Sequence, residues 1–113
     1  MSAKLFDVDA HALAELRSLA YHREIARRIA RDHALVDRAR DRVREWLRTL
    51  RPVPGYARAW DAILGRPLTE LLRFLEEDSE RARELRQSTP FAGIVPPRER
   101  WRIWRDVRER GHV

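Results

Sequence analysis

The feature that most constrains this chain is the spacing of its apolar residues, which return every three or four positions along most of the sequence. The clearest case lies between about residues 34 and 50. There the apolar set steps by three, four, three and four residues: Val36, Ala39, Val43, Trp46 and Leu50. This spacing places one apolar stripe along an α-helix, whereas a half-buried strand would alternate apolar and polar residues. The sequence therefore predicts an all-α fold.

Capping residues, prolines and glycines divide this pattern into five or six helices. Asp7 or Asp9 can cap the first helix, which leaves residues 1–9 as an N-terminal segment that can be flexible. The expected helices cover residues 10–31, 34–50, 56–64, 67–77, 79–87 and 97–110. The sequence thus predicts a single compact helical domain over residues 1–113 with a long N-terminal helical pair. That pair could protrude and form a homodimer.

Arginine supplies nearly all of the positive charge. The chain has 24 Lys+Arg against 18 Asp+Glu, a formal net charge of +6, and Lys4 is its one lysine. Arginine binds phosphate and carboxylate groups bidentately, which would suit a nucleic acid or an acidic protein as partner. Acidic residues are interleaved with the arginines along nearly every expected helix, however. This pattern favours ion pairs on solvated helix faces over a continuous track for phosphates.

Composition excludes several classes of protein. The chain has no cysteine, which excludes a disulfide framework and a thiolate metal site. No apolar run approaches the roughly 20 residues that a membrane-spanning helix needs, so no membrane partner is expected. The first residues lack the apolar core of a secretory signal, and we therefore expect a cytoplasmic location.

The sequence predicts no metal site, no cofactor and no catalytic activity. His11, His22 and His33 are spaced by eleven residues, which would hold neighbouring imidazoles ~16 Å apart on a continuous helix, too far to share a metal ion. His22 is expected to pack between helices or to form hydrogen bonds at the surface. The serines lie outside known nucleophile motifs, and the four glycines stand alone, so no phosphate-binding loop is present.

The apolar, proline-bounded segment of residues 90–97 (PFAGIVPP) has two interpretations that the sequence leaves open. It can be a plug, in which Phe91 and Ile94 fill the helical core, or a docking loop, since prolines reduce the entropy lost on binding. If the segment docks, the predicted partner-binding residues are Gln87, Pro90, Phe91, Ile94, Val95, Arg98 and Trp101.

Binding of DNA or RNA by a small regulatory protein is the alternative function. The last expected helix would then lie along phosphates, with Trp101 and Trp104 available for stacking on bases. The predicted nucleic-acid-binding residues are Arg98, Arg102, Arg105 and Arg108. Trp101, Trp104 and Val107 share one helix face, however, which is the spacing of core packing. No convincing helix-turn-helix is present either.

Five segments carry a recognisable pattern: residues 17–22 (RSLAYH), 38–46 (RARDRVREW), 56–60 (YARAW), 79–88 (SERARELRQS) and 90–101 (PFAGIVPPRERW). In these segments the chain resembles small helical antitoxin-type proteins of bacteria that accompany a nucleotidyltransferase-like toxin. Some members of this group carry an Xre-type helix-turn-helix before the shared region, which here covers about residues 16–107 and has no such motif before it. The resemblance implies a non-catalytic antitoxin that neutralises a cognate protein by stoichiometric binding.

Overall fold

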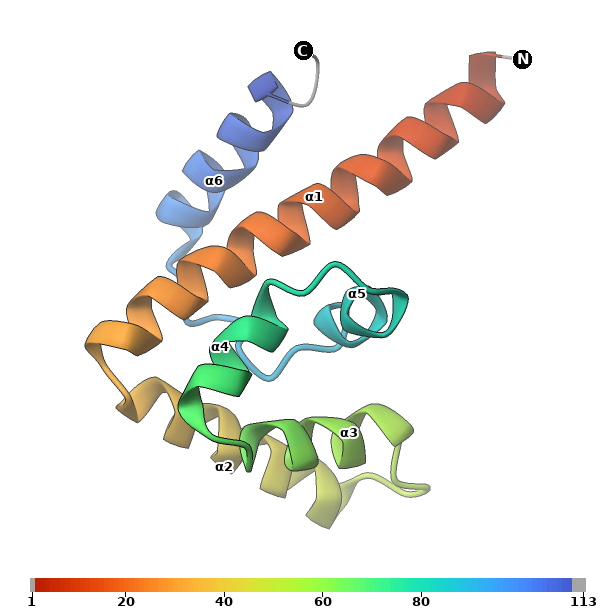
Figure 1. The fold of residues 1–113 in the computed structure, drawn as a ribbon. Coiled ribbons are helices and arrows are strands. Elements are labelled where there is room, and N and C mark those ends of the chain that lie inside the picture. The colour runs from red at the N-terminus through yellow and green to blue at the C-terminus, as the bar shows by residue number, and fades with distance from the viewer. Residues whose placement is uncertain (1, 111–113) are drawn as a thin grey trace.

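The computed structural model describes the backbone of residues 2–110 and the side chains of residues 10–110. Within this range the chain folds into six α-helices and contains no strand (Figure 1). The helices are α1 (Ser2–Arg31), α2 (Ala34–Thr49), α3 (Gly55–Leu64), α4 (Leu68–Leu75), α5 (Glu80–Arg86) and α6 (Pro97–Arg110). The predicted all-α fold with a long N-terminal helical pair is confirmed. None of these helices combines the length and the apolar character that crossing a bilayer requires.

The first helix starts earlier than its sequence indicates. We expected Asp7 or Asp9 to cap a helix that begins near Ala10, and this prediction is wrong because α1 begins at Ser2 and runs through both aspartates. No proline or glycine interrupts residues 2–9, so nothing in this segment keeps the helix from extending back to Ser2. The helix ends where predicted, at Arg31, and the carboxylate of the following Asp32 accepts a hydrogen bond of 3.1 Å from the backbone N–H of Ala34 in α2.

The apolar stripe of α2 faces the core as predicted. Val36, Ala39 and Val43 are buried, and Trp46 is half-buried at the margin. The Trp46 ring meets the ring of Tyr56 edge to face at 5.3 Å between centroids, which joins the end of α2 to the start of α3. The two helices lie side by side at one end of the molecule (Figure 1).

Trp60 of α3 is the centre of the core. Its fully buried ring makes edge-to-face contacts with Phe74 of α4 at 5.7 Å and with Phe91 at 6.1 Å between centroids. Its indole N–H donates a 3.0 Å hydrogen bond to the carbonyl oxygen of Leu85 in α5. One side chain thus connects three helices and the α5–α6 loop (residues 87–96), as aromatic residues often do in small cores.

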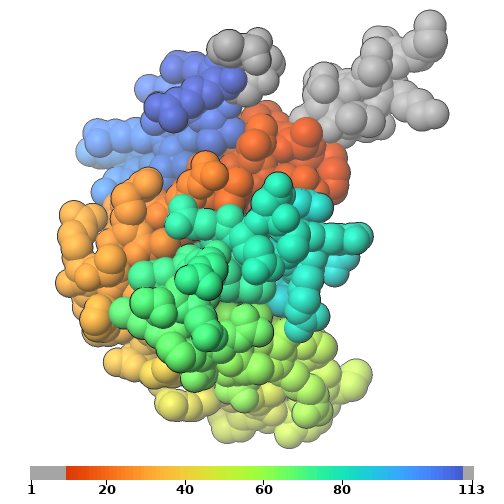
Figure 2. All heavy atoms as spheres, viewed as in Figure 1, coloured from red at the N-terminus to blue at the C-terminus, as the bar shows by residue number. Residues whose placement is uncertain are grey.

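The long helix α1 separates α6 from the rest of the molecule. Helices α4 and α5 pack against one side of α1 and α6 against another (Figure 1). The space-filling view shows α6 on the flank of α1, at the end away from α2 and α3 (Figure 2). Arg28 of α1 holds the start of α6 through a 2.9 Å ion pair with Glu99, and it also pairs with Glu24 on its own helix.

Candidate functional site

Helix α6 is amphipathic, yet none of its residues is buried. Ile103, Trp104 and Val107 are half-buried against α1, whereas the side chain of Trp101 is 60% exposed. The expectation that Trp101 lies in the core is therefore wrong. A helix that packs on a single neighbour can cover only the stripe that faces it, and Trp101 lies beside that stripe. Its ring instead meets Trp104 edge to face at 5.8 Å.

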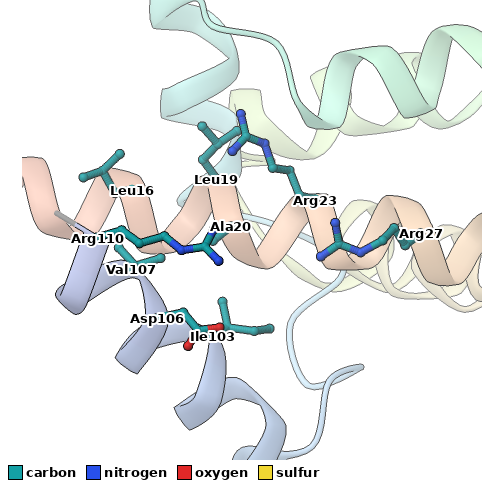
Figure 3. A pocket seen from close by; sticks show the side chains of 9 residues that line it. All are labelled: Leu16, Leu19, Ala20, Arg23, Arg27, Ile103, Asp106, Val107 and Arg110. Atoms are coloured by element: carbon teal, nitrogen blue, oxygen red, sulfur yellow. The ribbon is translucent and has the colours of Figure 1, made fainter. Parts of the chain in front are cut away.

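A groove of about 410 Å³ runs between α1 and α6, and we call it the α1–α6 groove (Figure 3). Its apolar lining comes from both helices: Leu16, Leu19, Ala20, Ile103 and Val107. Its polar lining consists of Arg23, Arg27, Asp106 and Arg110. Leu16 is 45% exposed at the open edge of the groove. The arrangement is an accessible apolar strip bordered by three arginines and one aspartate.

A second concave site, the arginine pocket, shares no lining residue with the groove and measures about 370 Å³. It is formed by α1, α5, the α5–α6 loop and α6. Its lining includes Arg17, Tyr21, His22, Arg86, Thr89, Gly93, Arg100 and Trp104. Gly93 adopts a φ of +82°, a backbone conformation that glycine reaches without strain. No carboxylate is among the residues that line this pocket.

The ring of Trp104 lies against two of the three arginines that line the arginine pocket. The guanidinium carbon of Arg17 lies 5.6 Å, and that of Arg100 lies 5.1 Å, from the centre of the Trp104 ring. Both are cation–π distances. The Nε atoms of Arg17 and Arg100 are buried and have no hydrogen-bond partner within residues 10–110. Each therefore presents a donor that the described part of the chain does not use.

The third arginine, Arg86, is only 3% exposed and has a structural role. Its Nη1 donates to the carbonyl oxygens of Leu75 at 3.4 Å and Glu77 at 2.9 Å, which are carbonyls at the C-terminal end of α4. Burial, with a smaller effect of the neighbouring Arg83, lowers the pKa of Arg86 from its ordinary value. A buried guanidinium of this kind stabilises a helix end and adds positive charge to the pocket.

His22 is buried beside Arg86 and takes part in a defined hydrogen-bond chain. Its Nδ1 lies 2.7 Å from the carbonyl oxygen of Ser18, so Nδ1 carries the proton and donates it. Its Nε2 lies 2.9 Å from the hydroxyl of Thr89, which donates to it. The backbone N–H of Phe91 donates in turn to the Thr89 hydroxyl at 3.1 Å. Burial lowers the pKa of His22 to about 4, so its imidazole is neutral near pH 7. The packing and hydrogen-bonding role predicted for His22 is confirmed, although in the interior.

The predicted partner-binding residues divide into two groups. Pro90, Phe91 and Val95 are buried, so these residues of the 90–97 segment form the plug. The loop is held from both sides, since the Tyr21 hydroxyl donates to the Phe91 carbonyl at 2.7 Å and Arg42 donates to the Ala92 carbonyl at 2.8 Å. The remaining residues are half-buried or exposed: Ile94, Gln87, Arg98 and Trp101. In this conformation the loop offers a partner far less apolar surface than a docking loop would.

The arginines predicted for nucleic-acid binding are all exposed on α6. These residues are Arg98, Arg102, Arg105 and Arg108. Within residues 10–110 the ion pairs use other arginines, such as Arg27 with Glu24 and Arg48 with Glu45. The α6 arginines therefore project into solvent next to the exposed ring of Trp101.

In the part of the chain that the structure describes, no three His, Asp or Glu side chains come together as a set of metal ligands. Comparison of the chain with protein-family models, with curated proteins and with solved structures gives no match. The resemblance to antitoxin-type proteins therefore stays a prediction.

Proposed function

We propose that this chain is a non-catalytic binding protein that inhibits a cognate protein by stoichiometric binding, as the antitoxin-like member of a toxin–antitoxin pair. The observation that supports this function is the α1–α6 groove. Protein interfaces combine an apolar centre with a polar border and are enriched in arginine and aromatic residues. The groove has the apolar centre and the arginine-rich border, although no aromatic residue lines it, and the exposed Leu16 extends its apolar strip toward the solvent.

Charge favours an acidic partner surface. Three arginines and one aspartate border the groove. Arg23 and Arg27 already pair with Glu76 at 3.6 Å and Glu24 at 2.9 Å, but the whole chain carries a formal net charge of +6. Opposite charges around an apolar contact speed association and suppress wrong partners. The proposed occupant is therefore an apolar side chain of the partner protein flanked by carboxylates. A specific interface of standard size would bury about 800 Å² on each side, so it would extend beyond the groove over the outer surfaces of α1 and α6.

The experiment that tests this function starts from capture of the partner. The tagged chain is used as bait in a lysate of its own cells, treated with nuclease, at low and high salt. We expect a single protein bound at a 1:1 ratio that survives high salt, because apolar contacts are not screened by ions. The purified partner should then lose its activity in proportion to the amount of chain added, with complete inhibition at one equivalent.

Two matched variants test whether the groove makes the contact. Leu16→Glu places a carboxylate at the open edge of the groove, where Leu16 is 45% exposed, so the fold should be preserved. Ala34→Glu adds the same charge at an exposed position at the start of α2. Capture and inhibition should be lost in the first variant and kept in the second. Equal inhibition by both variants would exclude the groove, and absence of any captured protein would contradict the function itself.

Nucleic-acid binding is the second candidate function. It is favoured by the exposed arginines of α6 beside Trp101, which could contact phosphates and a base. Such binding should weaken steeply as salt rises, because counterions are released from the phosphates. Omitting the nuclease in the same capture experiment measures it. Capture of nucleic acid alone, with loss of that nucleic acid at high salt, would favour this candidate. A dimer of the chain without any captured partner would indicate that a second copy covers the groove.

A further inference from the structure

We infer that the arginine pocket is a binding site for a small phosphorylated ligand, held by the guanidinium groups of Arg17 and Arg100. This site is separate from the α1–α6 groove and does not depend on the proposed partner protein. Its lining comes from α1, α5, the α5–α6 loop and α6, so residues far apart in the sequence form it together.

The charges in this pocket differ from those on the rest of the surface. Elsewhere the chain places a carboxylate three residues before many arginines, as in the pairs Glu24–Arg27, Asp41–Arg44 and Glu45–Arg48. Arg17 and Arg100 have no such partner within residues 10–110, and the lining contains no carboxylate at all. Like charges brought together in a concave site repel one another unless an anion compensates them. Arg86 lies near the carboxylates of Glu15, Glu77 and Asp78, which offset its charge. The uncompensated positive charge of the pocket therefore belongs to Arg17 and Arg100, and an anionic ligand would neutralise it.

The donors in the pocket are also positioned in advance. The Nε atoms of Arg17 and Arg100 are buried without a partner, and both guanidinium groups are kept near the Trp104 ring by cation–π contacts. The Nη groups of Arg17 and Arg100 are not closed off from solvent as the Nε atoms are, and they make no hydrogen bond within residues 10–110, so they remain free to bind a ligand oxygen. Arginine presents its N–H groups as a planar fork that matches two oxygens of one phosphate. Guanidinium groups held by an aromatic ring lose little entropy when such a ligand binds.

The number of positive groups favours phosphate over carboxylate. Two guanidinium groups without an acidic partner, those of Arg17 and Arg100, line the site together with the buried Arg86. A phosphate monoester carries nearly two negative charges near neutral pH, whereas a carboxylate carries one. The volume of about 370 Å³ lies at the small end of the range for small-molecule sites. Inorganic phosphate and a nucleoside monophosphate are the two sources of this group, and the exposed ring of Trp101 beside Trp104 could stack on the base of the latter.

The test is a titration of the purified full chain at low salt with four probes: inorganic phosphate, AMP, adenosine and acetate. Calorimetry measures affinity, and the Nε–H resonances of the arginines in NMR spectra report which side chains respond. We expect saturable 1:1 binding of inorganic phosphate and AMP, with the Nε–H signals of Arg17 and Arg100 shifting most. AMP binding more tightly than phosphate would identify a nucleotide as ligand, and equal affinities would identify phosphate itself.

Variants separate the pocket from general attraction to a basic protein. Arg17→Met and Arg100→Met each remove one unpartnered guanidinium, and Arg73→Met removes an exposed arginine of α4 outside the pocket. Loss of one charge-assisted contact should weaken phosphate binding roughly tenfold in the first two variants and less than about twofold in the third. Circular dichroism confirms that each variant is folded. Three outcomes would overturn the inference. These are equal weakening of phosphate binding in all three variants, binding of acetate or adenosine as tight as that of AMP, and the absence of saturable binding.

Discussion

His22 shows how one residue can join two parts of the chain that are far apart in sequence. Its imidazole lies between the Ser18 carbonyl in α1 and the Thr89 hydroxyl in the α5–α6 loop, and the Phe91 N–H completes the hydrogen-bond chain. With a neutral ring, Nδ1–H donates to the Ser18 carbonyl and Nε2 accepts a hydrogen bond from the Thr89 hydroxyl. Protonation would make Nε2 a donor, so the Thr89 hydroxyl would have to turn and accept from it, and would place a buried positive charge beside Arg86.

The stability of the protein should therefore depend on pH through His22. Burial lowers its pKa from 6.5 to about 4, so the folded state favours the neutral ring. This contribution is fully present above pH 6.5 and is lost as the pH falls from 6.5 toward 4. The loss should reach about 3 kcal/mol of unfolding free energy. Urea unfolding at pH 7 and pH 4 measures the difference.

Two substitutions isolate the contribution of this histidine. His22→Gln removes the titrating group, and the stability difference between pH 7 and pH 4 should shrink by about 3 kcal/mol. His33→Gln changes an exposed histidine and should leave the difference as in the original protein. The same pH dependence in both variants would mean that His22 is not the group that titrates.

At the scale of elements, the α5–α6 loop acts as part of the core. Phe91 is fully buried against Trp60, whereas Ile94 is half-buried. Removing the Phe91 ring should cost about 3–5 kcal/mol, because the cavity left behind collapses only in part. We expect Phe91→Ala to lower the thermal midpoint by more than about 10 °C and Ile94→Ala to lower it less. Thermal unfolding followed by circular dichroism measures both, and an unchanged midpoint in Phe91→Ala would contradict the buried plug.

Helix boundaries could be predicted from the sequence largely because local chemistry determines them. Ser79 caps α5 through a 3.1 Å hydrogen bond from the Ala82 N–H to its hydroxyl, and the prolines near residues 52–54 end the second helix within about one residue of the expected place. The predicted start of α1 was wrong because nothing in residues 2–9 stops a helix. The prediction that Trp101 is buried was wrong for another reason. Helix periodicity shows which residues share a face, but it does not show how many neighbouring helices cover that face.

At the scale of the whole molecule, the candidate sites could not be predicted from the sequence. Arg17, Arg86 and Arg100 are separated by many residues, and only the packing of α5 and α6 on α1 brings them into one pocket. The capping role of Arg86 on α4 likewise has no local sequence signal. Arg100 and Trp104 are about one turn apart on α6, so a helical wheel places them on the same face. The wheel does not reveal that Arg17 from α1 joins them.

The core connects all six helices into one cluster, and this predicts a single cooperative unfolding transition. Buried residues from α1 to α5 and the α5–α6 loop belong to this cluster, and Ile103 of α6 packs against it. Val43 in α2 is 1% exposed, so Val43→Asp would put a charge in the cluster without a partner. Such a change should cost at least about 4 kcal/mol, against the 5–15 kcal/mol that typically stabilises a whole domain.

We therefore expect Val43→Asp to be unfolded or strongly destabilised throughout, including α6, which is far from α2. Circular dichroism and the dispersion of amide signals in NMR spectra measure this loss. Arg38→Asp, a larger change of charge at an exposed position of the same helix, should change the unfolding free energy by less than about 1 kcal/mol. Loss of helicity confined to α2 and α3 would show that the chain unfolds in two parts. A folded Val43→Asp protein of unchanged stability would show that the stripe of α2 is not buried.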